Sequence, residues 1–179
     1  LFEKVEKPMK LYVGFDPTAD SLHLGHLMGI MALAWFQRAG HTPYVIVGGA
    51  TARIGDPSGK SVERPLLADE VIGENVKALR SSFEKILSSS QGPKPVLLNN
   101  HDWLGEIPFP DFLRDVGRHF RINQMLAKES VKSRLDSEEG MSFTEFTYQI
   151  LQAYDFAHLH RAHGVTLQMG GSDQWGNIT

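Results

Sequence analysis

The strongest constraint on the fold comes from residues 12–26, which read Y-V-G-F-D-P-T-A-D-S-L-H-L-G-H. An apolar strand end leads into a turn that contains Asp16, Pro17 and Thr18, and an amphipathic helix follows at once. Proline fixes φ in such a turn, and Asp or Ser side chains cap the free N–H groups of the helix. Unpaired N–H groups and the helix dipole converge at this point, so the sequence predicts an anion-binding corner.

Strand and helix patterns alternate along the whole chain of 179 residues. Apolar strand patterns cover residues 10–15, 43–47, 95–99 and 165–169. Helical patterns cover residues 24–39, 68–87, 111–120, 123–135 and 142–163. Ser142, followed three residues later by Glu145, predicts a capping box at the start of the last of these helices. The alternation predicts an α/β fold with a doubly wound parallel sheet, whose ligands bind at the carboxyl ends of the strands.

Composition excludes several classes of function. The chain has no cysteine, which rules out disulfide scaffolds, cysteine zinc sites and thiol catalysis. Its net charge of −3 gives no basic footprint for nucleic acid, and no apolar run reaches the ~18 residues of a membrane span. The chain opens on Leu1 and stops after a helix-like start, so we expect a fragment of a longer protein. The absence of cysteine suits a reducing compartment, and we expect the cytoplasm or an organelle matrix.

Two histidines, His23 and His26, lie three residues apart where the first helix begins. Imidazoles at this position can donate hydrogen bonds to phosphate oxygens. A zinc site would need a third ligand, and Leu24 stands where a metalloprotease helix has its glutamate, so no metal ligand is assigned. The spacing alone leaves a phosphate site and a solvated or capping pair as alternatives. Gly25 and Gly29 indicate either a close approach to the helix backbone or tight helix–sheet packing.

A glycine-rich loop at residues 48–61 follows the second strand. It contains Gly59-Lys60-Ser61 but is not a P-loop, because Ile54 stands where the leading glycine belongs. One interpretation is a mobile loop in which Asp56 lies near the strand end and Lys60 and Arg64 fold over a polyphosphate. The other is a surface loop with ordinary charges.

The helix predicted at residues 142–163 carries Tyr148, Gln152 and Asp155 on one face. We expect the opposite, apolar face to pack on the sheet; it contains Phe146, Ile150, Ala153 and Ala157. The polar stripe then points either to water or into a pocket, where a phenol, an amide and a carboxylate suit an ammonium and a hydroxyl.

The last strand ends at Gln168, and an acidic residue, Asp173, opens the next helix after two glycines. A carboxylate at such a place accepts hydrogen bonds from ribose hydroxyls, or it simply caps the helix. Together with the three clusters above, it predicts a site for a nucleoside triphosphate and a small polar ligand.

These motifs resemble those of class I aminoacyl-tRNA synthetases, and among them the bacterial and organellar tyrosyl-tRNA synthetases. H-L-G-H is similar to the HIGH signature of that class, with leucine in the second place. V-G-G-A-T-A-R-I-G-D-P-S-G-K, L-Q-A-Y-D-F and Q-M-G-G-S-D-Q-W-G-N-I follow in the order of the family. The resemblance implies that residues 1–179 form part of a Rossmann-like catalytic domain. It also implies a helical, dimer-forming insert at about residues 111–141, and no KMSKS segment or tRNA-binding domains within this chain.

The resemblance also implies the site residues. Tyrosine is expected to contact Tyr12, Asp56, Tyr148, Gln152, Asp155, Gln168 and Gln174. Of these, Tyr12 and Asp155 hold the phenol, while Asp56, Tyr148 and Gln152 hold the α-ammonium. ATP is expected to contact Gly14, Asp16, Thr18, His23, Gly25, His26, Gly29, Gly171 and Asp173. Catalytic contacts to the phosphates are expected from His23, His26, Thr18, Lys60 and Arg64. Relatives often have a cysteine at the position of Val13 and a threonine at that of Gly29.

The implied reaction joins tyrosine to ATP as tyrosyl-adenylate, releases pyrophosphate, and then transfers tyrosine to tRNA(Tyr). The resemblance further implies a homodimer, Mg²⁺ bound with ATP, and no membrane. Because the attacking carboxylate is already ionised, positioning and phosphate binding suffice without a general base. We expect this chain alone to bind tyrosine but to activate it poorly. The alternatives are a related HxGH-type adenylyltransferase, such as the tryptophan-specific relative, and a non-catalytic synthetase-like binding module.

Overall fold

The computed structural model describes residues 7–60, 63–88 and 91–179, so Ser61 of the predicted loop lies outside the described residues. Its centre is a parallel four-stranded sheet with the order β3-β2-β1-β4. The strands are β1 (Lys10–Phe15), β2 (Thr42–Val47), β3 (Val96–Asn99) and β4 (Leu167–Gln168). The predicted α/β fold class is confirmed, and β1 has the predicted bounds.

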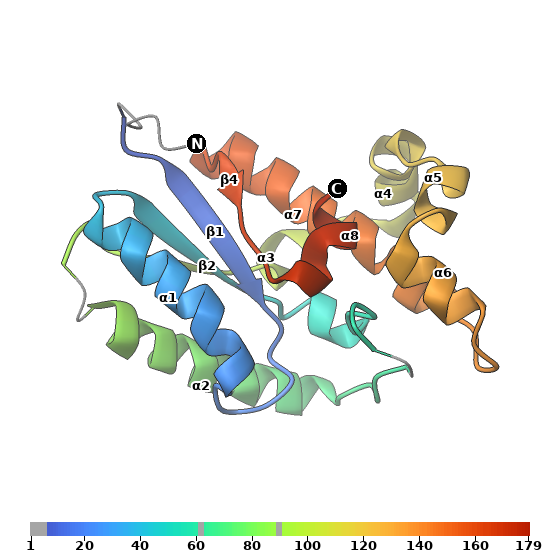
Figure 1. Cartoon of the computed structure of the whole chain (residues 1–179), viewed down its shortest axis with the longest axis horizontal. Coiled ribbons are helices and arrows are strands. Elements are labelled where there is room, and N and C mark those ends of the chain that lie inside the picture. The colour runs from blue at the N-terminus through green and yellow to red at the C-terminus, as the bar shows by residue number, and fades with distance from the viewer. Residues whose placement is uncertain (1–6, 61–62, 89–90) are drawn as a thin grey trace.

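Helices cover both faces of the sheet (Figure 1). α1 (Leu24–Arg38) and α2 (Asp69–Ser88) lie on one face, and α7 (Phe143–His163) lies on the other. Alternate residues of β1 contact the helices on the two faces, since successive side chains of a strand point to opposite faces of the sheet. Leu11, Val13 and Phe15 pack in one core cluster with residues of α1 and α2. Tyr12 packs in a second cluster with Leu159 of α7.

The chain between β3 and α7 forms a set of short helices. These are α3 (His101–Leu104), α4 (Phe109–Asp115), the 3-10 turn η2 (Gly117–His119), α5 (Ile122–Leu126) and α6 (Glu129–Leu135). The chain ends in the 3-10 turn η3 (Ser172–Gln174) and α8 (Trp175–Ile178), and another 3-10 turn, η1 (Thr51–Arg53), follows β2. Among the residues that the structure describes, no helix is long and apolar enough to cross a membrane.

The prediction of one helix at residues 123–135 is wrong. Lys128 is extended, with φ −67° and ψ 137°, and separates α5 from α6. Its Nζ donates a hydrogen bond of 2.5 Å to the carbonyl of Gly176 in α8. The break thus coincides with a tertiary contact to a residue 48 positions away, and local helical periodicity contains no such contact. The helix predicted at residues 111–120 also stops early. α4 ends at Asp115, and Gly117, a poor helix former, begins the 3-10 turn η2.

The long helix α7 is confirmed, but two predictions about it are wrong. Ser142 caps it by accepting a hydrogen bond from the Glu145 N–H at 3.2 Å, yet no capping box forms, because the Glu145 carboxylate binds Arg134 instead. The apolar residues Phe146, Ile150, Ala153 and Ala157 are only half-buried. The stripe that contains Tyr148 and Asp155 is buried instead, because polar partners at the sheet edge satisfy its side chains.

Candidate active site

Asp16, directly after β1, joins two other elements at the carboxyl edge of the sheet. Its Oδ1 accepts a hydrogen bond from Thr51 Oγ1 at 2.7 Å, and its Oδ2 accepts one from Tyr148 OH at 2.7 Å. Burial raises the pKa of Asp16 to about 6; the two hydrogen bonds oppose this shift, and the nearby Asp56 adds to it. Burial, and then the Asp16 charge, raise the pKa of Tyr148 well above 10. Tyr148 therefore stays a protonated donor to Asp16.

Asp155 lies about two turns beyond Tyr148 along α7 and is 5% exposed. Its Oδ1 accepts a hydrogen bond from Trp103 Nε1 at 2.8 Å, and its Oδ2 accepts one from Asn100 Nδ2 at 3.0 Å. Burial raises the pKa of Asp155 to about 7, against the lowering effect of these two donors. The carboxyl group is thus held rigidly, and it titrates near neutral pH.

Tyr12 has a buried hydroxyl that finds no hydrogen-bond partner within the described residues. The residue is 2% exposed, and its ring packs on Phe156 with the centroids 5.8 Å apart. Burial, followed by the Asp155 charge, raises the pKa of Tyr12 well above 10. Two residues on, Gly14 is exposed although it lies in a central strand, and a Cβ atom there would meet nothing within 4 Å. The surface therefore opens above β1 on the side of Tyr12 and α7.

A chain of hydrogen bonds connects Asp16 with Asp155. The Asn100 amide donates to Thr51 Oγ1 at 3.0 Å and to Asp155 Oδ2, while Thr51 donates to Asp16. Asn100 also accepts a bond from the Ala50 N–H at 2.8 Å, which fixes the loop after β2 against the end of β3. The predicted residues at the two ends of the site are therefore linked through side chains that are themselves buried.

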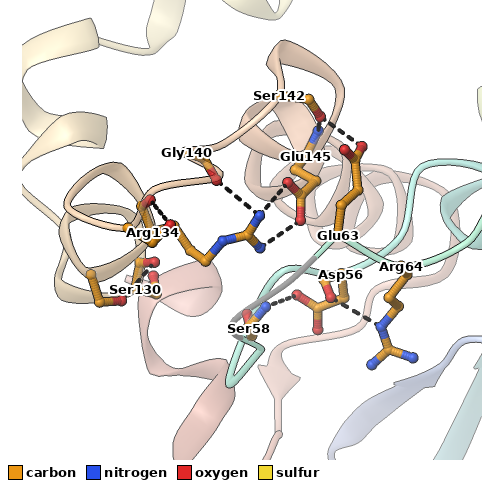
Figure 2. Close-up of polar contacts among 11 residues, drawn as sticks. Asp56, Ser58, Glu63, Arg64, Ser130, Arg134, Gly140, Ser142 and Glu145 are labelled. Carbon is orange, nitrogen blue, oxygen red and sulfur yellow. Dashed lines mark hydrogen bonds and ion pairs between the residues drawn. The ribbon is translucent and has the colours of Figure 1, made fainter.

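Asp56 forms a second polar centre, in the loop after β2 (Figure 2). Its carboxylate accepts hydrogen bonds from the Ser58 N–H at 2.9 Å, Gln174 Nε2 at 2.7 Å and Asn177 Nδ2 at 3.2 Å. Arg64 Nε donates to the Asp56 backbone carbonyl at 3.2 Å, and Lys60 is exposed nearby in the chain. Gln174, expected from the sequence to contact the substrate, thus binds Asp56 here.

The two histidines at the start of α1 cap the helix together. His23 Nδ1 accepts a hydrogen bond from the Gly25 N–H at 3.1 Å, and the His23 N–H donates to His26 Nδ1 at 3.3 Å. Their rings stack with the centroids 3.7 Å apart. Burial, and then His23, lower the pKa of His26 below its ordinary value. A Cβ at Gly29 would lie 3.1 Å from Phe15, so tight helix–sheet packing accounts for this glycine.

The remaining predicted residues lie at the same edge. Gln168 is the register partner of Tyr12 and is half-buried, as are Gln152 of α7 and Thr18 of the turn after β1. Asp173 is exposed, accepts a hydrogen bond from Gln174 at 2.9 Å, and follows the exposed Gly171. No group of three or more His, Cys, Asp or Glu side chains that could hold a metal occurs in the part of the chain that the structure describes.

Four residues of this site were missed by the sequence reasoning: Thr51, Asn100, Trp103 and Asn177. Asn100 follows the end of β3, where polar residues meet the ligand edge of a parallel sheet. That signal was available in the sequence. Trp103 lies on α3, a single turn of helix for which no prediction was made.

Comparison with known proteins gives consistent matches. The family model described as tRNA synthetases class I (W and Y) matches residues 3–179. A tyrosine–tRNA ligase of Protochlamydia amoebophila is 62% identical over 97% of this chain and 41% of its own length. A chloroplastic/mitochondrial tyrosine–tRNA ligase of Arabidopsis thaliana is 56% identical over 96% of this chain and 34% of its own length. The chain therefore spans about two fifths of the curated relatives or less.

Solved structures match over nearly the whole chain. A C-terminally truncated mitochondrial tyrosyl-tRNA synthetase from Aspergillus nidulans superposes with a TM-score of 0.85 at 38% identity. The match covers 97% of this chain and 51% of that one. A tryptophanyl-tRNA synthetase from Campylobacter jejuni has the same fold, with a TM-score of 0.67 at 17% identity.

Proposed function

Because the chain belongs to the class I tRNA synthetases for tryptophan and tyrosine, we propose that it is the tyrosine-activating part of a tyrosine–tRNA ligase. One observation carries the choice of tyrosine: the buried Tyr12 hydroxyl, which has no partner among the described residues, close enough to Asp155 for the carboxylate to raise its pKa. A phenol hydroxyl can donate to a carboxylate while it accepts from a second hydroxyl. The indole of tryptophan only donates, and phenylalanine does neither.

The proposed tyrosine site has two ends. Tyr12 and Asp155 bind the phenol, beside Gln168. Asp56, Tyr148 and Gln152 bind the α-ammonium, and Gln174 lies near the substrate carboxylate. Rejection of phenylalanine follows because its ring would leave buried polar groups unpaired, a rule for which tyrosyl-tRNA synthetases are themselves the standard example.

The proposed ATP site lies at the start of α1. A tyrosine carboxylate oxygen forms a bond to the α-phosphorus, and the bond from that phosphorus to the bridging oxygen breaks, so pyrophosphate leaves with the electron pair. His23, His26 and Thr18, with Lys60 and Arg64 of the loop, bind the leaving phosphates as their charge develops. Asp173 accepts from the ribose, and Gly14, Asp16, Gly25 and Gly171 line the nucleotide. Mg²⁺ accompanies ATP, with no protein ligand assigned.

Transfer of tyrosine to tRNA(Tyr) requires the further domains that full-length relatives contain. We propose that residues 1–179 are most of the catalytic domain, with the insert at about residues 111–141 as the homodimer contact. Exposed apolar side chains on this insert and the residues before it support a contact surface; they include Phe109, Leu113, Ile122 and Leu126. We place the protein in the cytoplasm or an organelle matrix, as one relative is chloroplastic/mitochondrial.

Calorimetry of the 179-residue chain with L-tyrosine, L-phenylalanine and L-tryptophan tests this proposal. We expect measurable binding of L-tyrosine and no measurable binding of L-phenylalanine or L-tryptophan. Equal affinity for tryptophan would favour the tryptophan-specific relative, and no binding of any of the three would favour a non-catalytic module. Pyrophosphate exchange should be slow, and a rate close to that of a full-length relative would contradict our expectation that this chain activates tyrosine poorly.

A further inference from the structure

Arg134 and Glu145 form a buried ion pair outside the site described above (Figure 2). The guanidinium Nη1 and Nη2 donate to Glu145 Oε1 and Oε2 at 2.7 and 2.9 Å, and Nη2 also donates to the Gly140 carbonyl at 3.0 Å. The two side chains are 3% and 2% exposed. In every other ion pair found among the described residues, both side chains are at least 44% exposed.

Stability alone is a poor explanation for this pair. Removing two charges from water offsets most of their attraction, and apolar side chains of similar volume are often equally stabilising. Arg134 Nε is also buried with no hydrogen-bond partner in the described part of the chain. A bidentate pair does provide direction, however, because two parallel N–H···O bonds fix the distance and angle between the elements that carry them.

The two elements are α6 of the insert and the first turn of α7. Glu145 lies three residues before Tyr148, so both side chains project from the same face of α7. Tyr148 OH binds Asp16 Oδ2 at 2.7 Å, which sets the ammonium end of the site. Fixing Glu145 against Arg134 therefore fixes the start of α7, and with it the position of the Tyr148 hydroxyl.

A second contact links the insert with the other wall of the same end. Lys128 Nζ donates to the carbonyl of Gly176, and a Cβ on Gly176 would lie 2.8 Å from Ser130 Oγ. The next residue, Asn177, donates to Asp56 Oδ1 at 3.2 Å. The α5–α6 segment thus contacts both α7 and α8, the two helices whose side chains reach Asp16 and Asp56.

We propose that Arg134 and Glu145 are positioning residues for the ammonium end of the tyrosine site. They act through Tyr148, and the α5–α6 segment is the support that holds α7 at its working distance from Asp16. This inference rests on the proposed function, because it assumes that tyrosine binds between Tyr148 and Asp56.

A double-mutant cycle on the 179-residue chain tests the inference. The pair is replaced by apolar residues of similar length, as Arg134→Met with Glu145→Leu, in the parent and in a Tyr148→Phe background. Circular dichroism and thermal melting check folding, and calorimetry gives the Kd for L-tyrosine. The matched control is the exposed α2 pair, changed as Arg80→Met with Glu84→Leu, which should leave that Kd unchanged.

We expect the apolar pair to weaken tyrosine binding about tenfold in the parent, the loss of roughly one charge-assisted hydrogen bond. In the Tyr148→Phe background the same change should alter the Kd by less than about twofold, because the residue through which the pair acts is already disabled. If the apolar variant does not fold, Glu145→Gln takes its place in the same cycle.

Two results would overturn the inference while leaving the proposed function intact. One is a folded variant that binds tyrosine as tightly as the parent. The other is an equal loss of affinity in both backgrounds, which a general loosening of the structure would produce. Failure of the parent itself to bind L-tyrosine would overturn both the inference and the proposed function.

Discussion

Replacing Tyr12 by phenylalanine should raise the stability of the chain and lower its affinity for tyrosine. The hydroxyl that is lost is buried and has no partner among the described residues. An unpaired buried donor costs about 1–3 kcal/mol, so its removal should increase the free energy of unfolding by about 1–2 kcal/mol. For a domain of this size, that corresponds to a rise in Tm of about 2–8 °C.

The same free energy should appear with the opposite sign in binding. In the proposed complex, the Tyr12 hydroxyl would donate to the phenol of the bound tyrosine, so the cost of burying it would be recovered there. Tyr12→Phe should therefore raise the Kd for tyrosine by about 5- to 30-fold, the factor that corresponds to about 1–2 kcal/mol. Calorimetry gives the Kd, and urea unfolding without ligand gives the stability.

Tyr44→Phe is the matched control. Tyr44 is the register partner of Tyr12 on β2 and is 5% exposed. It lies outside the proposed contacts, so its replacement should leave the Kd unchanged. A Tyr12→Phe chain that is less stable than the parent would refute the reasoning, because the hydroxyl would then have an internal partner. An unchanged Kd would show that Tyr12 does not contact the ligand phenol.

Three further predictions concern pH dependence and packing. The pKa of Asp155 is about 7 in the folded chain, against an ordinary 3.8. Between pH 3.8 and pH 7 the folded state therefore binds more protons than the unfolded state. The free energy of unfolding should fall as the pH rises through this window, by up to about 1.4 kcal/mol per pH unit. Asp155→Asn should flatten this part of the urea-unfolding profile, and an unchanged slope would assign it to other groups. Asn100→Ala should cost about 2–4 kcal/mol in urea unfolding, because it leaves buried donors and acceptors unpaired; a loss below about 1 kcal/mol would contradict this. Gly29→Ala should destabilise the chain by about 1–3 kcal/mol, since its Cβ would crowd β1. Gly73→Ala, at an uncrowded position in the second turn of α2, should instead stabilise the chain by about 0.5–1 kcal/mol. Thermal melting of both variants tests this, and equal shifts in Tm would refute the packing explanation.

Most of the fold could be predicted from local patterns, because the parallel sheet is built from apolar runs that need no distant information. β1 and the long helix α7 are examples, with bounds that match the prediction within one residue. The break at Lys128 was not predicted in this way; it coincides with a side-chain contact to the distant Gly176 carbonyl, which local patterns do not contain. Hydrophobic periodicity describes one segment at a time, whereas this contact joins the α5–α6 segment with α8.

The buried face of α7 shows a different limit. Its polar stripe looks like a solvated face when polarity alone is counted, and the same pattern predicts that the apolar face packs on the sheet. Tyr148 and Asp155 are buried because Asp16, Asn100 and Trp103 supply their hydrogen bonds. A polar side chain can face the interior wherever such partners converge, and only the tertiary structure shows that they do.

The hydrogen-bond chain from Asp16 through Thr51 and Asn100 to Asp155 has a consequence for how this pocket can evolve. A substitution at Asp155 alone leaves an Asn100 N–H without an acceptor, and a substitution at Asn100 releases the loop that holds Thr51. Mutations at the proposed ring end and the proposed ammonium end are therefore epistatic even without a bound ligand, because buried side chains connect the two ends. Paths toward a different amino acid would pass through paired substitutions, and libraries that vary these positions one at a time would find mostly unstable chains.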